Sequence, residues 1–317
     1  MLTNTHPSIP GPMHGPKSGP DPLAEIRAAR AFLMRLIDRY CPDLEHLVLH
    51  IGPLAAAERL RSGDIPGILR EQVTPDGVRA AAAAVEVDAE TSARCGARLL
   101  IPEDEQWPTA LAATMGIPGA QGMWVRGRAG LEMLSQPSVV VSGARAASGY
   151  GIHVATDLAG ELSGAGRVIM SGAGFGIDAA AHRGALAAQG TTVAVLPCGI
   201  DRAHPSAHEH LLDRIAENGL VVSAQPPRTM MTRARVLDRN RLLAALGDAT
   251  VVVEAAARSG VLHLAGAANA SGRPVMAVPG PVTSALSVGT HRLIRDGATM
   301  VTGSGDVIAG LRQPWYP

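Results

Sequence analysis

Two glycine-rich turns in this 317-residue chain carry residues suited to phosphate binding. Each turn follows an apolar run and leads into a helical pattern, so unpaired backbone N–H groups and the helix dipole favour an anion there. Arginine adds a fixed positive charge, and serine adds a hydroxyl donor. The candidate phosphate-binding residues in these turns are Gly143, Arg145, Ser148, Gly151, Ser171, Gly172 and Gly174.

A strongly basic segment lies between Gln225 and Arg241. It holds five arginines and one aspartate, a local net charge of +4 in a chain whose 28 basic and 28 acidic residues balance. We expect Arg239-Asn240-Arg241 to open a helix at the ligand-binding edge of a sheet, which favours phosphate binding over a solvated charged surface. The further candidate phosphate-binding residues from this part of the chain are Arg239, Asn240, Arg241, Ser259 and Gly260.

The residues suited to catalysis are few. Lys17 is the only lysine, which excludes a Walker A lysine or a Schiff base in the folded body. We expect Asp178 to be a carboxylate at a helix N-terminus and His182 to be a helix-surface histidine. Glu254 ends a predicted strand, where it acts either as a general acid or base or as a partner that holds an arginine of the basic segment. We favour the second role.

The composition describes an ordinary globular protein. Hydrophobic residues make up 46% of the chain and charged residues 18%. The three cysteines, Cys41, Cys95 and Cys198, lie far apart, which predicts free thiols and no metal site. No apolar run is long enough to cross a membrane. We therefore expect a cytoplasmic protein without membrane contact, metal or cofactor.

From residue 137 onward, apolar runs alternate with amphipathic helical stretches. Seven strands are predicted at 138–142, 168–171, 192–196, 220–223, 250–254, 275–278 and 299–301. Helices are predicted at 152–163, 177–188, 207–218, 239–246, 262–270 and 290–296. This alternation predicts an α/β fold with a doubly wound, mostly parallel sheet of extended Rossmann type.

Three regions are predicted along the chain. Residues 1–22 are rich in proline and glycine and are expected to be a disordered leader. Residues 23–98 show helical periodicity and predict a small N-terminal helical domain, resembling sterile-alpha-motif or helix–hairpin–helix modules. Within it we expect one helical block from Leu44 to Arg61, and a turn at Gly52 that serves packing rather than DNA contact. Residues 99–317 are expected to form the extended Rossmann domain, which carries the candidate phosphate-binding residues.

The chain resembles the DprA/Smf family of DNA-processing proteins over roughly residues 100–311. The matching segments are the run from Asp104 to Pro108, both glycine-rich turns, Asp238 to Arg241, Val253-Glu254, Ser259-Gly260, Pro279-Gly280, Gly289-Thr290 and Gly297-Ala298. The resemblance implies an extended Rossmann fold, binding of single-stranded DNA in natural transformation, competence and DNA recombination, and loading of a RecA-type recombinase. It also implies a homodimer.

Two readings of the function compete. The first is a non-catalytic protein that binds the backbone of single-stranded DNA largely without sequence preference. The alternative is a nucleotide-binding or nucleotide N-glycoside-hydrolysing enzyme of the related LOG-like superfamily, with Glu254 as the acid. That superfamily's Pro-Gly-Gly-x-Gly-Thr-x-x-Glu loop is represented here only by Pro279-Gly280-Pro281. The sequence therefore favours the DNA-binding protein.

Overall fold

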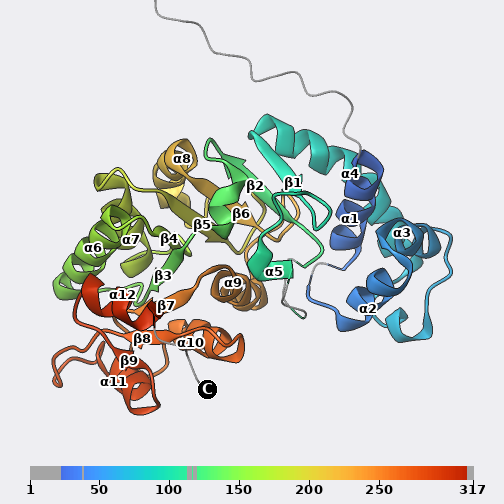
Figure 1. Ribbon diagram of the computed structural model, residues 1–317. Helices are drawn as coiled ribbons and strands as arrows, with labels where there is room; N and C mark the ends of the chain where they lie inside the picture. Colours follow the sequence, from blue (N-terminus) through green and yellow to red (C-terminus); the bar gives the residue numbers. More distant parts are fainter. Residues whose placement is uncertain (1–22, 38, 113–115, 117–119, 313–317) are drawn as a thin grey trace, which may run out of the picture.

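The computed structural model describes residues 23–37, 39–112, 116 and 120–312, and the expected leader at 1–22 lies outside these residues. One nine-stranded sheet, in the order β1-β2-β6-β5-β4-β3-β7-β8-β9, runs through the described part of the chain (Figure 1). Its seven parallel strands are β3 (Ser138–Ser142), β4 (Val168–Ser171), β5 (Thr192–Leu196), β6 (Leu220–Ser223), β7 (Ala249–Val252), β8 (Val275–Ala277) and β9 (Thr299–Met300). The mostly parallel α/β fold predicted from the sequence is confirmed.

Two further strands extend the sheet beyond the prediction. They are β1 (Ala97–Leu100) and β2 (Met123–Gly127). They pair antiparallel with each other, and β2 pairs antiparallel with β6. The first of them spans the predicted boundary between residues 98 and 99, so the end of the expected helical domain is already part of the sheet.

Helices cover both faces of the sheet. The first face carries α6 (Gly149–Gly164), α7 (Ile177–Ala187), α8 (Glu209–Asn218) and α12 (Ser304–Arg312). The second carries α9 (Arg233–Leu246) and α10 (Val261–Ala270). Alternation along β3 shows this directly, because Val139 and Val141 pack toward α6 and α7 whereas Val140 packs toward the other face. All three valines are fully buried, as expected for a sheet covered on both sides.

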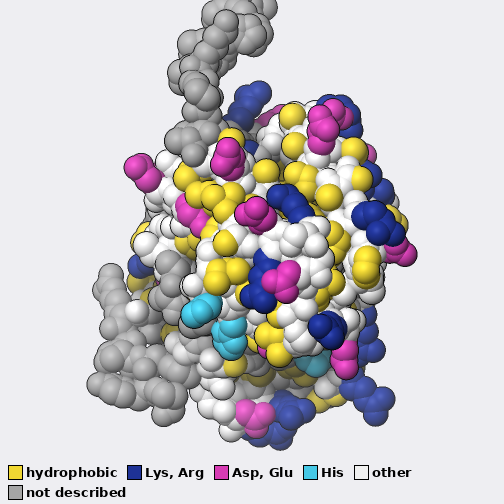
Figure 2. Space-filling model, turned by 90° about the vertical axis from the view of Figure 1, so that its right-hand side faces the viewer, with side chains coloured by type: hydrophobic (Ala, Val, Ile, Leu, Met, Phe, Trp, Pro, Cys, Tyr) yellow, Lys and Arg dark blue, Asp and Glu magenta, His cyan; other side chains and the backbone are white. Residues whose placement is uncertain are grey.

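Four helices form the N-terminal module: α1 (Ala24–Leu36), α2 (Pro42–Ile51), α3 (Pro53–Arg61) and α4 (Pro75–Arg94). The helical segment predicted from Leu44 to Arg61 is found as two helices, α2 and α3, and the turn expected at Gly52 lies between them. Gly52 has a φ of +81°, a conformation that glycine adopts freely, and it separates α2 from α3. Phe32, Leu33 and Leu60 centre a separate hydrophobic cluster within the module. Figure 2 shows the side of the molecule where these helices lie in Figure 1, and there basic, acidic and hydrophobic side chains are interspersed.

Helix α1 fastens the module to the edge of the sheet through arginines. Arg27 donates to both carboxylate oxygens of Asp104, at 2.8 and 3.0 Å. Arg30 donates to both carboxylate oxygens of Glu103, each at 2.8 Å. Met34, from the same helix, belongs to the hydrophobic cluster beneath β1 and β2. The module is therefore packed against the sheet and fixed in position by bidentate ion pairs.

The order of the strands reverses between β3 and β7. The chain runs outward from β3 through β4, β5 and β6, and then returns to place β7 on the opposite side of β3. In open parallel sheets, ligands bind outside the carboxyl ends of the strands at such a switch point. Among the described residues, no helix is long and apolar enough to cross a membrane.

Candidate nucleic-acid interface

A pocket of about 540 Å³ opens at this switch point. Its floor includes Ser142 and Gly143, at the carboxyl end of β3. One wall is α9, and another is the segment from Arg258 to Val261, which leads from β7 into α10. The volume lies within the range of roughly 300–1,000 Å³ that is typical of small-ligand sites.

Arginines give this pocket a net positive charge. Arg145 follows β3, Arg233 and Arg239 lie on α9, and Arg258 precedes α10. Asp178, at the start of α7, is the one acid in the lining. Four guanidinium groups against one carboxylate leave a formal charge of +3, counting histidine as neutral. Such a pocket attracts phosphates.

Arg239 is the most enclosed of the four arginines. Its guanidinium lies directly over Gly172, where any Cβ atom would collide with it. Burial lowers the pKa of Arg239, the carboxylate of Asp178 raises it, and the charge of Arg145 lowers it again. Arginine nevertheless stays protonated at neutral pH because its ordinary pKa lies far above 7. A charge that is partly removed from water and close to a second arginine gains from an incoming anion.

Asp178 is held firmly within the pocket. The hydroxyl of Ser142 donates to one carboxylate oxygen at 2.6 Å, and the backbone N–H of Gly174 donates to the other at 3.1 Å. The expected carboxylate at a helix N-terminus is thus found. His182, expected on the helix surface, is instead fully buried, and its Nδ1 lies 2.8 Å from the hydroxyl of Thr192. That expectation was wrong because α7 is covered on both sides.

The first glycine-rich turn is filled by the protein's own carboxylate. Glu254 accepts hydrogen bonds from the backbone N–H and the hydroxyl of Ser148, at 2.9 and 2.6 Å. A Cβ atom at Gly151 would collide with this carboxylate. The predicted role of Glu254 as the partner of an arginine in the basic segment is therefore wrong. Ser148 and Gly151 pack against Glu254 and do not line the pocket.

The second glycine-rich turn supports the pocket from below. The hydroxyl of Ser171 donates to the carbonyl of Val141 at 2.7 Å, which ties β4 to β3. Gly172 makes room for Arg239, and Gly174 donates to Asp178. These three predicted ligands lie outside the pocket lining and position the residues that form it.

Helix α9 begins earlier than predicted. Its N-cap is Thr232, whose side chain accepts a hydrogen bond from the backbone N–H of Arg235. Arg239, Asn240 and Arg241 are therefore the seventh to ninth residues of the helix and do not open it. Two positions along the helix correspond to about 200°, and Arg241 therefore points away from Arg239. Arg241 lies outside the pocket lining, and its nearest acid is Asp238 at 3.8 Å. Of the twelve predicted ligands, those brought together here are Gly143, Arg145, Arg239, Asn240, Ser259 and Gly260.

Two lining arginines were absent from the predicted set. Arg233 belongs to the basic segment, but the expected helix start at 239 placed it in a loop. Arg258 directly precedes the predicted Ser259-Gly260 turn. In the sequence, both arginines lie close to predicted phosphate-binding residues. Only the three-dimensional arrangement shows that their side chains line the pocket.

An aromatic side chain lies beside this cationic region. Phe175 is 48% exposed and packs edge-on against His208, with ring centroids 4.7 Å apart. Gly176, the next residue, lies against the backbone carbonyl of Arg145. His204 is within the field of both arginines, because burial and then the charges of Arg145 and Arg239 lower its pKa. The turn that carries the exposed Phe175 ring therefore lies next to the backbone of Arg145, one of the pocket arginines.

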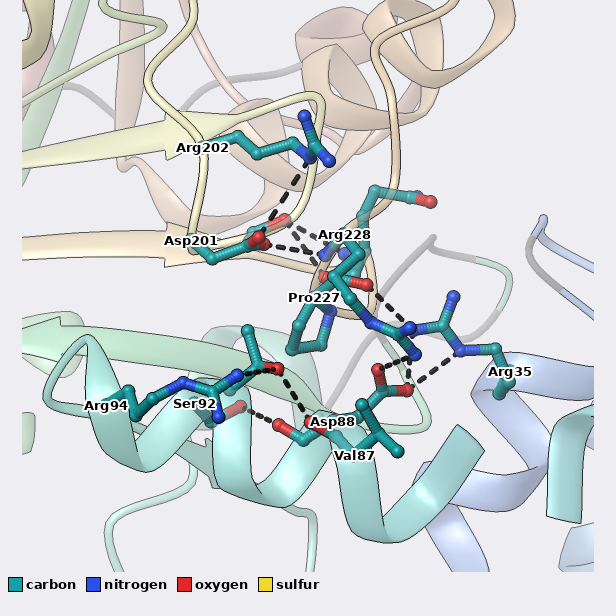
Figure 3. Close-up of polar contacts among 12 residues, drawn as sticks. Arg35, Val87, Asp88, Ser92, Arg94, Asp201, Arg202, Pro227 and Arg228 are labelled. Carbon is teal, nitrogen blue, oxygen red and sulfur yellow. Dashed lines mark hydrogen bonds and ion pairs between the residues drawn. The ribbon is translucent and has the colours of Figure 1, made fainter. Parts of the chain in front are cut away.

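The loop before α9 is fastened on two sides (Figure 3). Asp88, buried on α4, accepts from Arg35 at 2.8 and 2.5 Å and from Arg228 at 3.0 Å. Arg35 also donates to the carbonyl of Pro227 at 2.7 Å. The backbone N–H of Arg228 donates to Asp201 at 2.7 Å, with Arg228 at a φ of +64°. We call Asp88, Arg35 and Arg228 the Asp88 clamp, because together they join the N-terminal module to the loop that leads to Met231 and Arg233.

These features define an extended Rossmann-type α/β protein with an arginine-lined pocket at its topological switch point. The family model described as "DNA recombination-mediator protein A" matches residues 98–312. The chain belongs to this family of DNA-processing proteins.

Relatives agree in sequence and in structure. The chain is 41% identical over 297 residues to the "Putative DNA processing protein DprA" of Mycobacterium tuberculosis, covering 91% of this chain and 75% of that protein. The X-ray structure of DNA processing protein A from Streptococcus pneumoniae superposes with a TM-score of 0.70 at 27% identity, covering 90% of this chain and 96% of that one. The structure of DNA processing protein A from Helicobacter pylori, which gives insight into the single-stranded DNA binding mode of that protein, superposes with a TM-score of 0.61 at 27% identity. That match covers 69% of this chain and 97% of the other.

Proposed function

We propose that this chain is a non-catalytic protein that binds single-stranded DNA in the pocket at the switch point. The observation that carries the proposal is the convergence of Arg145, Arg233, Arg239 and Arg258 on one small volume with a single acid. Guanidinium groups bind phosphate oxygens bidentately, and binding of this kind is largely independent of sequence. The Helicobacter pylori relative, described as a single-stranded DNA binder, supports the same assignment.

Phe175 supplies the second element of such a site. Base–aromatic stacking contributes about 1–3 kcal/mol per base and tolerates every base, because each presents a flat face. Phe175 is exposed and precedes Gly176, which lies against the backbone of Arg145, so we expect a strand whose phosphates contact the arginines to place a base against this ring. A duplex, whose bases are already stacked and paired, gains nothing from this ring.

The nucleotide-hydrolysing alternative has less support. Both oxygens of Glu254 accept hydrogen bonds from Ser148, and the residue is outside the pocket lining. A general acid must reach the bond it protonates from within the site. Incubation with nucleoside monophosphates tests this alternative, and release of free base would overturn the non-catalytic proposal.

The proposed role extends to recombination. Family membership supports action in natural transformation, with delivery of the bound strand to a RecA-type recombinase, in the cytoplasm and as a homodimer. These parts are tested by a solution mass measurement and by recombinase filament assays on strands coated with the protein. A monomer at all concentrations, or no effect on filament formation, contradicts the respective part.

The primary test is a binding titration with single- and double-stranded oligonucleotides of equal length at several salt concentrations. Tighter binding to single strands, with affinity that falls steeply as salt rises, is expected. Equal affinity for both forms, or indifference to salt, would show that the arginine pocket does not hold the strand.

A further inference from the structure

Glu254 is a buried carboxylate that lies against the backbone of the first glycine-rich turn. It follows β7 and is 4% exposed. Its oxygens accept from the backbone N–H and the hydroxyl of Ser148, and this hydroxyl also accepts from the backbone N–H of Gly151 at 3.1 Å. A Cβ atom at Gly151 would collide with the carboxylate, and one at Gly143 would lie 2.9 Å from the carbonyl oxygen of Glu254. The turn is therefore shaped around this one acidic residue.

No cation balances the Glu254 carboxylate. Among the described residues, its polar partners are the N–H and the hydroxyl of Ser148, and it forms no ion pair. A carboxylate that is buried without a cation costs free energy unless hydrogen bonds offset the loss of water. The partners that it has, which are a backbone N–H, a hydroxyl and the positive end of α6, are those that hold phosphates at helix starts. Glu254 thus takes the place of a phosphate.

The first turn is the place where a Rossmann-type sheet holds the phosphates of a nucleotide. It joins β3 to α6, a helix of 16 residues, beside the switch point of the sheet. The turn also faces solvent, because Gly149 and Tyr150 are exposed and a Cβ atom at Gly149 would meet no other atom within 4 Å. A phosphate from solution therefore competes with the Glu254 carboxylate for the same donors.

We propose that Glu254 is a specificity-determining residue, whose carboxylate keeps the phosphate groups of free nucleotides out of the first glycine-rich turn. It acts by occupying the donors and by repelling a second anion, so the turn is selective through exclusion. The inference goes beyond the proposed function, because it concerns the turn and holds whether or not the neighbouring pocket binds a strand. The fold keeps the phosphate turn of a nucleotide-binding protein but fills it with its own acid.

The test compares two variants of Glu254. Glu254→Ala empties the turn, whereas Glu254→Gln fills it with an uncharged side chain of nearly the same size. Isothermal titration calorimetry measures the binding of inorganic phosphate and of adenosine 5′-monophosphate to each variant and to the unaltered chain. Ser148→Ala, alone and combined with Glu254→Ala, removes a donor of the turn and leaves the pocket arginines in place. Thermal unfolding checks that each variant folds, and Glu254→Ser replaces Glu254→Ala if that variant does not.

We expect Glu254→Ala to bind both ligands about 10-fold more tightly than the unaltered chain, or better, because a phosphate then accepts charge-assisted hydrogen bonds from the turn. Adding Ser148→Ala is expected to remove most of this gain, and Glu254→Gln is expected to gain much less. A folded Glu254→Ala with unchanged affinity for both ligands would overturn the inference. An equal gain in Glu254→Gln would do the same, because it would trace the effect to lost negative charge near the arginines. So would a gain that survives Ser148→Ala, because the phosphate would then be bound elsewhere.

Discussion

Removing the Arg239 side chain is expected to lower the salt dependence of single-stranded DNA binding by about one phosphate contact. For single strands, log K falls by about 0.7 per logarithmic unit of salt for each neutralised phosphate. With one phosphate at each of the four pocket arginines, the slope is about −2.8, and in Arg239→Ala it becomes about −2.1. Raising monovalent salt from about 50 to about 200 mM then weakens the unaltered chain about 50-fold and the variant about 18-fold.

Fluorescence anisotropy with a labelled oligo-dT at five salt concentrations measures both slopes. Arg241→Ala is the matched control, because it removes an equal charge from the same helix on the side away from the pocket. The slope of the control is expected to equal that of the unaltered chain. A control slope that falls as far as the Arg239→Ala slope would show that the strand follows another face of α9, and the assignment of the pocket would be refuted.

Three further outcomes follow from contacts described above. Asp88→Ala is expected to lower the free energy of unfolding by about 2–3 kcal/mol in urea titrations. The loss is smaller than for breaking a fully buried ion pair because both arginine partners are partly exposed. An unchanged free energy of unfolding would mean that water replaces the contacts of the Asp88 clamp without cost. Gly172→Ala displaces the Arg239 guanidinium and reproduces the lowered salt slope of Arg239→Ala, whereas Gly149→Ala, whose Cβ meets open space, leaves that slope unchanged. Burial lowers the pKa of His182 to about 4, so on acidification the unfolded chain protonates this imidazole before the folded chain does. The free energy of unfolding from urea titrations is expected to fall by about 3 kcal/mol between pH 6.5 and pH 4, and His182→Gln is expected to lack this fall.

The parallel sheet was predictable because its signal is local. Runs such as Val139–Val141 are continuously apolar, and each is followed by a turn and a helical pattern, so strand and helix follow from neighbours in sequence. The strands β1 and β2 were missed because their evidence is not local. Met123 to Gly127 becomes a strand by pairing with β6, almost a hundred residues further on.

The site was predictable in its place but only partly in its residues. The switch point follows from strand order, and the arginine-rich segment that borders it is visible in the sequence. Which arginines line the pocket depends on where α9 begins, and α9 begins at Arg233, six residues before the predicted start. Glu254 was misjudged for a related reason, since its partner Ser148 lies more than a hundred residues away.

The glycines illustrate a second limit of sequence reasoning. A glycine-rich turn before a helix indicates free backbone N–H groups, but the sequence of the turn does not show which acceptor binds to them. Here Glu254 takes the first turn and Asp178 the second, so the protein supplies its own anions to both helix starts. The formal positive charge of the pocket comes from arginine side chains, and composition and spacing do not say where these side chains lie.

The Asp88 clamp has a practical consequence for how this protein is dissected. A fragment that starts at residue 99 lacks Asp88, the carboxylate partner of Arg228, and Arg35, the donor to the carbonyl of Pro227. It also lacks the first two residues of β1. The segment that aims Arg233 into the pocket then loses one of its two anchors. Weak DNA binding by such a truncated protein would report a loosened arginine loop, even if the deleted helices never touch the strand.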